Sequence, residues 1–247
     1  VCLLGDQCQL PPTVMCNEPR ALTASTPLFT RLVNDGVEPL LLDTQYRMHP
    51  AIAELPSDLI YAGKLFNGVS AEQRPHMLGF DWPRVEMPVV LLAVAGTESF
   101  EANGSSVLNH AEADRVVSVV AKLLHYGNPT GHIGVITPYA AQARLLRSKL
   151  RGSIGFGGSD LVEVSLVDGF QGREKECIIF SCVRTRSLGF LSDARRFNVA
   201  MTRAKRGLIV VGHPPTLGKD SKTWSHWLAW ARSNGLVIGE PPSGSPH

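Results

Sequence analysis

The sequence lacks several features that would place it in a class at once. Its five cysteines are odd in number and no two stand as Cys-x-x-Cys, so neither a disulfide framework nor a zinc site is indicated. The histidines show no pairing at metal-ligand spacing, and we predict no metal held by protein ligands alone. No apolar run is long enough to span a bilayer, and the first nine residues lack the zones of a signal peptide. We therefore expect an intracellular protein of the nucleus or cytoplasm, without a membrane partner.

An excess of charge is also absent. The formal net charge is +2 and charged residues make up 19% of the sequence, which permits a nucleic-acid partner but does not indicate one. Hydrophobic residues make up 44% of the 247 positions. The chain is therefore long enough to bury the core of one large domain, or of one domain with a fragment of another.

Short β-branched runs alternate with helical patterns along the chain. A helix is predicted to begin at Asn109 and Glu112, which are spaced as in a capping box, and to stop near Gly127; a second is predicted to begin at Thr137 and Pro138. The runs are apolar on both faces, as in buried parallel strands, and cover residues 89–94, 133–137, 161–167, 177–183 and 208–211. This alternation predicts an α/β fold with a doubly wound, mainly parallel sheet and helices on both faces.

The remaining segments give weaker signals. The run Val1–Leu4 leads straight into Gly5 without a cap or turn, so we expect the chain to begin inside a sheet. Residues 61–88 show no clear period and are predicted to form an irregular connection. Trp224 and Trp227 fall on one helical face and are predicted to be core residues, whereas the Pro- and Ser-rich end is predicted to be disordered.

Four segments carry specific chemistry, and we expect each to lie at the end of an apolar strand, where open α/β sheets bind ligands. An amide side chain can form a hydrogen bond with a phosphate without adding charge. An arginine guanidinium can bind two phosphate oxygens at once, and a neighbouring aromatic ring can stack on a base. In chain order the segments read Gly-Asp-Gln-Cys-Gln-Leu-Pro-Pro at 5–12, Gln-Tyr-Arg-Met-His-Pro at 45–50 after the leucines 40–42, Val-Asp-Gly-Phe-Gln-Gly-Arg-Glu at 167–174, and Arg-Phe-Asn-Val-Ala-Met-Thr-Arg-Ala-Lys at 196–205.

Taken singly, these residues have purely structural explanations. A solvated helix charge would account for Arg203, a turn for Asp168 and a bend for Gly172. Such explanations give no reason for the four segments to follow one another in this order. A self-contained hydrolase is disfavoured, because no His or Cys nucleophile accompanies Asp168 and Glu174.

In this order the four segments resemble superfamily 1 helicases of the 5′-to-3′ type, in the subgroup that contains the nonsense-mediated-decay helicase, senataxin and Aquarius. The resemblance covers most of the chain. It implies a RecA-like second lobe over residues 37–235, preceded over 1–36 by the remnant of a first RecA-like lobe with a linking helix, and followed over 236–247 by a disordered tail. It also implies that the complete protein uses ATP and Mg²⁺ to translocate on, and unwind, single-stranded or partly duplex DNA or RNA.

The resemblance assigns roles to individual residues. Those implied at the γ-phosphate are Gln9, Arg47 and Arg203. Those implied to bind the rest of the nucleotide are Tyr46 near the adenine, Glu174 at the ribose hydroxyls, and Gln171 and Gly172 beside them. Those implied to contact the strand are Thr137, Tyr139 and Gln142 at a helix start, and Ser165, which stands next to Leu166 where the family commonly has Ser or Thr.

One block that ATP hydrolysis requires is missing from the sequence. It contains no Gly-x-x-x-x-Gly-Lys-Ser/Thr, so the phosphate cradle and the Mg²⁺ ligands are expected on the first lobe of the same protein. The chain alone is therefore predicted to be inactive. Three functions stay open: half of an ATP-driven helicase, a nucleic-acid-binding module without turnover, or a helicase-like scaffold. A P-loop encoded upstream would select the first.

Overall fold

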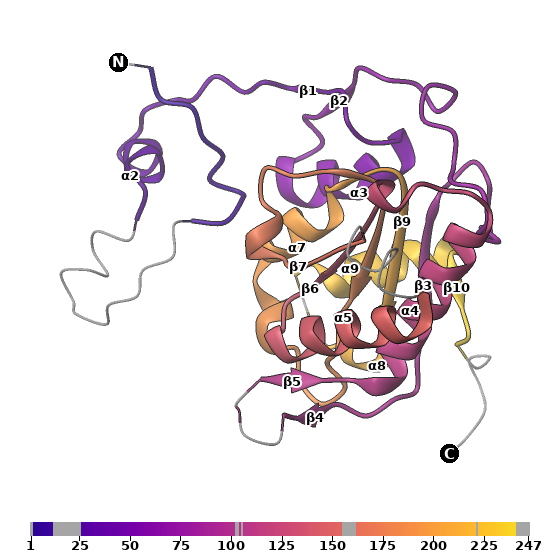
Figure 1. The fold of residues 1–247 in the computed structure, drawn as a ribbon. Coiled ribbons are helices and arrows are strands. Elements are labelled where there is room, and N and C mark those ends of the chain that lie inside the picture. Colours follow the sequence, from indigo (N-terminus) through magenta and orange to yellow (C-terminus); the bar gives the residue numbers. More distant parts are fainter. Residues whose placement is uncertain are drawn as a thin grey trace.

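The computed structural model describes residues 2–11, 26–101, 104, 106–154, 162–220 and 222–240, and one parallel sheet forms its centre (Figure 1). Six strands pair in the order β10-β3-β9-β8-β6-β7, and every pair is parallel. The predicted α/β fold is thus confirmed. The strands are β3 (Val89–Ala93), β6 (Ile133–Thr137), β7 (Glu163–Leu166), β8 (Lys175–Ser181), β9 (Ala204–Gly212) and β10 (Val237–Ile238).

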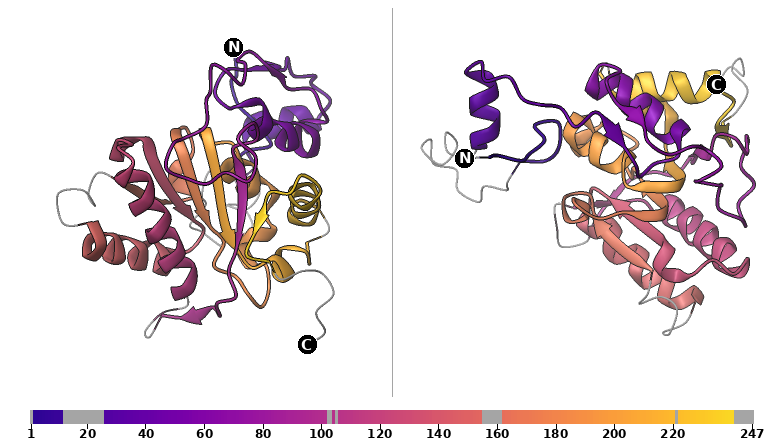
Figure 2. Two further views of the ribbon diagram at one scale, coloured as in Figure 1. Left: turned by 90° about the vertical axis from the view of Figure 1, so that its right-hand side faces the viewer. Right: turned by 90° about the horizontal axis from the view of Figure 1, so that it is seen from above.

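Helices cover both faces of this sheet, as the left view of Figure 2 shows. Strand β8 explains the arrangement, because Cys177 and Ile179 point into one apolar core while Ile178 and Phe180 point into the other. On the first face lie α4 (His110–His125) and α5 (Ala140–Ile154). On the second lie α3 (Pro50–Tyr61), α7 (Ala194–Met201), α8 (Pro214–Leu217) and α9 (Trp224–Ser233).

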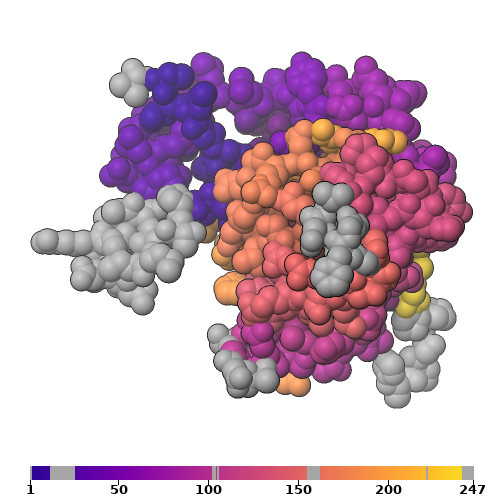
Figure 3. All heavy atoms as spheres, in the orientation of Figure 1, coloured from indigo at the N-terminus to yellow at the C-terminus, as the bar shows by residue number. Residues whose placement is uncertain are grey.

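Smaller elements flank the central sheet. Strands β1 (Thr44–Gln45) and β2 (Phe66–Asn67) form a parallel pair, and β4 (Ser99–Phe100) and β5 (Val107–Leu108) form an antiparallel one. Helix α2 (Leu28–Asn34) lies to one side of the sheet and its helices (Figures 1 and 3). Single 3-10 turns cover Thr130–His132, Asp168–Phe170 and Gly189–Ser192. Among the described residues, no helix has the length and apolar character needed to cross a membrane.

Two helices follow the sequence prediction closely. Asn109 caps α4 by accepting a hydrogen bond from the Glu112 N–H at 3.1 Å, and the chain leaves that helix through Gly127 at a φ of +85°. In α9 the indoles of Trp224 and Trp227 are both buried. Trp224 stacks on Phe180 and donates its indole N–H to a backbone oxygen, so it is a core residue as predicted.

Other expectations about where helices, strands and the tail begin were wrong, because they depend on which strands pair with one another. The second helix begins at Ala140, because Thr137 still pairs with Leu166 as the last residue of β6. Residues 2–6 and 40–42 form no strand, and Leu40 is 98% exposed. An apolar run becomes a strand only where a neighbouring strand forms hydrogen bonds with its backbone. The predicted disordered tail starts too early, since β10 pairs with Leu91 and Leu92. Residues 241–247, Val1 and Leu161 lie outside the described residues.

Candidate functional site

The charged residues of the last two sequence segments meet at the amino ends of two central strands. Glu174 precedes β8 and Arg203 precedes β9, and the Lys175 N–H donates to the Arg203 carbonyl at 3.1 Å. The expectation that the segments follow strand ends is therefore wrong for these two residues. The physical reason is the path of residues 167–174, which leave the carboxyl end of β7 and run to the amino end of β8.

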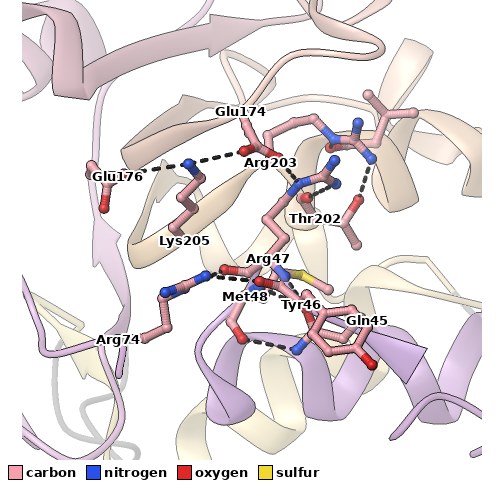
Figure 4. A network of polar contacts seen from close by, with 11 residues as sticks. Gln45, Tyr46, Arg47, Met48, Arg74, Glu174, Glu176, Thr202, Arg203 and Lys205 are labelled. Atoms are coloured by element: carbon pink, nitrogen blue, oxygen red, sulfur yellow. Dashed lines mark hydrogen bonds and ion pairs between the residues drawn. The ribbon is translucent and has the colours of Figure 1, made fainter. Parts of the chain in front are cut away.

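A tight turn carries Arg47 to the same place (Figure 4). The Gln45 side-chain oxygen accepts the N–H groups of Arg47 and Met48 at 2.9 and 2.7 Å, which fixes the backbone of the turn. Arg74 then donates to the carbonyl oxygens of Tyr46 and Arg47, at 2.8 and 2.9 Å. These contacts hold the Arg47 backbone from both sides, so the guanidinium projects from a fixed point toward β8 and β9.

Arg47 and Lys205 share one carboxylate. Glu174 lies 2.5 Å from Arg47 Nε and 2.9 Å from Lys205 Nζ, and Lys205 also lies 3.5 Å from Glu176. Hydrogen bonds from Arg47 and then Lys205 lower the pKa of Glu174, so its carboxylate is ionised at neutral pH. In this arrangement the predicted ribose ligand, Glu174, is held by two cations and orients Arg47.

Arg203 differs from its neighbours because it is buried without an acidic partner. It is 2% exposed, and its guanidinium donates to the Val199 carbonyl at 3.1 Å and to Thr202 Oγ1 at 2.8 Å. No ion pair links it to a carboxylate in the described part of the chain. Burial, followed by the nearby Arg47 charge, lowers the pKa of Arg203 to about 10, which still leaves it cationic at neutral pH. A buried cation of this kind favours the approach of an anion.

The first segment lies opposite these arginines. Asp6 accepts hydrogen bonds from the Cys8 N–H at 2.9 Å, from Gln9 Nε2 at 2.8 Å and from the Tyr61 hydroxyl at 2.7 Å. Asn198 of α7 donates to Tyr61 Oη at 2.8 Å and to the Cys8 carbonyl at 3.0 Å. Residues 6–9 are thereby attached to α3 and α7, and Gln9 faces the cluster.

A single cavity of about 470 Å³ separates the first segment from the arginines. Its size falls within the range of small-molecule sites. Gln9, Arg47 and Arg203 all line it, so the structure brings together the three residues implied at the γ-phosphate. Gln171 lines a neighbouring cavity of about 530 Å³ that also contains Gln9. Gly172 beside it has a φ of +79°, a backbone conformation that favours glycine.

Tyr46 stands next to the cavity with 66% of its surface exposed. Its ring lies directly over Gly68, where a β-carbon would come within 2.3 Å of Tyr46 Cε1. The absence of a side chain at Gly68 is therefore what allows the ring to lie there. A large aromatic face that is exposed yet fixed in place suits stacking on a base.

The four residues implied to contact the strand lie at the opposite, carboxyl end of the sheet, or along its β7 edge. Thr137 is fully buried and its hydroxyl has no hydrogen-bond partner among the described residues, while Ser165 is half-buried on β7. Gln142 is fully buried as well. Its amide binds the Asn109 backbone at 2.8 and 3.2 Å and Ser181 Oγ at 3.0 Å. Tyr139 is 5% exposed. In this structure neither Tyr139 nor Gln142 presents a polar group to solvent, so a direct contact of theirs with a strand is not supported.

Sequence reasoning missed the function of Glu112. Its carboxylate turns away from the cap of α4 and accepts the Ser181 hydroxyl at 2.7 Å and the Val183 N–H at 2.8 Å. The Asn109 N–H, which a full capping box would give to Glu112, binds Gln142 at 2.8 Å. The Asn-x-x-Glu spacing marked this pair, but it could not tell that the carboxylate serves a distant strand. No cluster of His, Cys, Asp or Glu suited to a metal occurs in the described part of the chain.

Comparison with known proteins gives clear matches. The sequence profile of the AAA domain family matches residues 24–215. The regulator of nonsense transcripts 1 homolog of Drosophila melanogaster is 42% identical over 96% of this chain, which covers 20% of that protein. The ATP-dependent helicase NAM7 of Saccharomyces cerevisiae is 40% identical over 96% of this chain, which covers 25% of that protein. The chain thus spans about a fifth to a quarter of the length of these relatives.

Among solved structures, the C-terminal domain of a possible DNA helicase from Lactobacillus plantarum can be aligned with this chain. The alignment covers 74% of this chain and 96% of the helicase domain. The sequence identity is 16% and the TM-score is 0.41. A score this low does not establish a shared fold.

Proposed function

The chain belongs to the AAA domain family, and we propose that it is the second motor lobe of an ATP-dependent helicase that moves along single-stranded DNA or RNA. The first lobe, with the P-loop and the Mg²⁺ ligands, would lie elsewhere in the same protein. This chain and that first lobe together make up the complete protein. The resemblance seen in the four segments agrees with relatives named as regulators of nonsense transcripts and ATP-dependent helicases.

The observation that carries the proposal is the convergence of Gln9, Arg47 and Arg203 on one cavity. Bound ATP and Mg²⁺ would supply the phosphoryl group and part of the charge compensation. Arg203 offers a buried cation that forms no ion pair within the described ranges of the chain, and Arg47 offers a second whose direction is fixed by Glu174. Two guanidinium groups so placed stabilise the negative charge that develops on a transferring phosphoryl group. Gln9 supplies a neutral amide on the opposite wall.

This assignment predicts that the chain alone folds but does not hydrolyse ATP. It holds cations and a base-stacking ring, whereas no residue here forms the cradle that fixes the γ-phosphate. The test is to express residues 1–247, verify folding by circular dichroism, and measure phosphate release with and without single-stranded nucleic acid. The complete protein, assayed in parallel, is expected to show strand-stimulated turnover. Robust turnover by the chain alone, or none by the complete protein, would contradict the proposal.

A second prediction concerns the base-stacking ring. In the complete protein, Gly68→Ala is expected to raise the KM for ATP roughly fivefold, the scale of one aromatic stacking contact, because the new methyl group displaces the Tyr46 ring. The kcat is expected to change little, since the arginines stay in place. Gly152→Ala is the matched control, because a β-carbon there meets nothing within 4 Å. If neither Gly68→Ala nor Tyr46→Ala changes KM, Tyr46 does not contact the nucleotide.

A further inference from the structure

The loop of residues 184–192 follows β8 at the carboxyl end of the sheet, and its entry is strained. Val183 has a φ of +71°, which a β-branched residue rarely adopts. Two side chains of the α4 start hold it there, because Glu112 accepts its N–H at 2.8 Å and Asn109 donates to its carbonyl at 3.2 Å. Strain held in place by buried polar groups is typical of functional positions.

A second buried carboxylate fixes the next turn of this loop. Glu98 is 5% exposed, and it accepts the N–H groups of Thr185 at 2.6 Å and Arg186 at 3.2 Å. It also forms an ion pair with Arg184 at 3.1 Å. Lys219 donates to the Arg186 carbonyl at 3.2 Å. The Arg186 backbone is thus held on both sides, while its side chain is exposed and has no partner recorded in the described part of the chain.

Tyr139 supports the far end of the loop from below. Its hydroxyl accepts the Phe190 N–H at 3.2 Å, and its ring lies 5.4 Å from the Phe190 ring. A β-carbon at Gly189 would come within 2.6 Å of the Tyr139 hydroxyl, so glycine is needed where the loop crosses it. Tyr139 therefore holds the 189–190 end of this loop in position.

The supported loop presents an apolar ring among cations. Phe190 keeps 53% of its surface exposed, although the Arg196 guanidinium lies 5.0 Å from its ring centre. Arg184, Arg186 and Arg195 lie within a few residues of it along the chain. Three of these arginines already form ion pairs, Arg184 with Glu98, Arg195 with Asp193, and Arg196 with Asp168. The exposed Phe190 ring and the exposed Arg186 side chain remain available on one loop. Such a pair can bind a single strand, because bases stack on rings and phosphates pair with arginines.

We propose that the 184–192 loop is a strand-binding platform in which Phe190 contacts a base and Arg186 a backbone phosphate of single-stranded nucleic acid. This inference rests on the proposed function. It moves the contact from the buried Tyr139 and Gln142 to the loop, where Tyr139 supports Phe190. A protein partner fits this surface less well, because the apolar area is a single ring.

The test measures the affinity of the complete protein for fluorescein-labelled 12-nucleotide oligouridylate and oligothymidylate by anisotropy. Phe190→Ala is expected to weaken binding about tenfold, in the range seen for one stacked base. Phe190→Tyr, which keeps the ring, is expected to restore it, whereas Phe190→Leu, which keeps only apolar volume, is not. Equal affinities of the wild type and Phe190→Ala would overturn the role of Phe190, and full rescue by Leu would reduce it to packing.

The phosphate contact has its own readout. Arg186→Ala is expected to lower the slope of log affinity against log salt by about one, because one phosphate contact is lost. Arg115→Ala is the matched control, since it removes an equal charge from an exposed position on α4. An unchanged slope in Arg186→Ala would overturn the contact while leaving the proposed function intact. Absence of strand binding by the wild type would overturn both.

Discussion

Replacing either Arg47 or Arg203 by Ala in the complete protein is expected to lower ATP turnover by a factor on the order of 10³, while single-strand affinity stays near that of the wild type. Both guanidinium groups line the cavity that also holds Gln9. Charge placed at a transferring phosphoryl group acts most strongly in the transition state, so the loss falls on kcat more than on binding. Steady-state phosphate release at saturating ATP and strand measures it.

The control for this experiment is Arg206, three residues after Arg203. Arg206 stands in β9 close to Arg203, but it donates to the Pro75 carbonyl and lies 3.9 Å from Glu176, away from the cavity. Arg206→Ala removes an equal charge and is expected to keep turnover within about twofold of the wild type, as for a surface substitution remote from the chemistry. Arg203 is buried, so the melting temperature of Arg203→Ala is measured as well. Near-normal turnover in folded Arg47→Ala and Arg203→Ala would remove both residues from the catalytic site.

The fold was predictable where the residues that stabilise a helix or strand lie within the same short segment of the chain. The apolar stripe and cap of α4 lie within one stretch of chain, and the runs of β6 and β8 are apolar on both faces, so local pattern and final structure agree. The leucines at 40–42 have the same local pattern as a strand. They stay irregular and exposed because no neighbouring strand pairs with them among the described residues.

The grouping of the site residues agrees with the sequence analysis, whereas their positions relative to the strands do not. The resemblance to superfamily 1 helicases named Gln9, Arg47 and Arg203 together, and the structure gathers these three residues around one cavity. The apolar run at 208–211 already indicated a strand after Arg203, and the structure shows that Arg203 lies between α7 and that strand, at the amino end of the strand. The sequence could not show that Gln142 is buried. The partners that satisfy its amide lie 33 and 39 positions away, and long-range pairing of this kind leaves no local signal.

Glu112 leads to a prediction about stability and pH. Burial raises the pKa of its carboxyl to about 8, against the opposing effect of hydrogen bonds from Val183 and Ser181, whereas an unfolded chain loses this proton near pH 4.5. The folded state therefore binds the proton more tightly. The stability contributed is fully present below about pH 4.5 and is lost as pH rises toward 8. The loss is at most about 5 kcal/mol, from the shift at about 1.4 kcal/mol per pH unit.

The measurement compares the free energy of unfolding of the wild type and Glu112→Gln in urea at pH 5, 6, 7 and 8. The amide keeps an acceptor for the Val183 N–H but cannot titrate, so the stability of the wild type relative to the variant is expected to fall steadily across this range. His49 and His213, whose pKa values burial lowers, titrate in the same window, but they are common to both proteins and cancel in the difference. Glu163→Gln is the control: hydrogen bonds from Arg173 and Lys175 outweigh the effect of burial and lower the pKa of Glu163, so its difference from the wild type stays flat above pH 5. A flat difference for Glu112→Gln as well would mean that the carboxylate is ionised throughout, and that a cation or water compensates it where the structure shows only neutral donors.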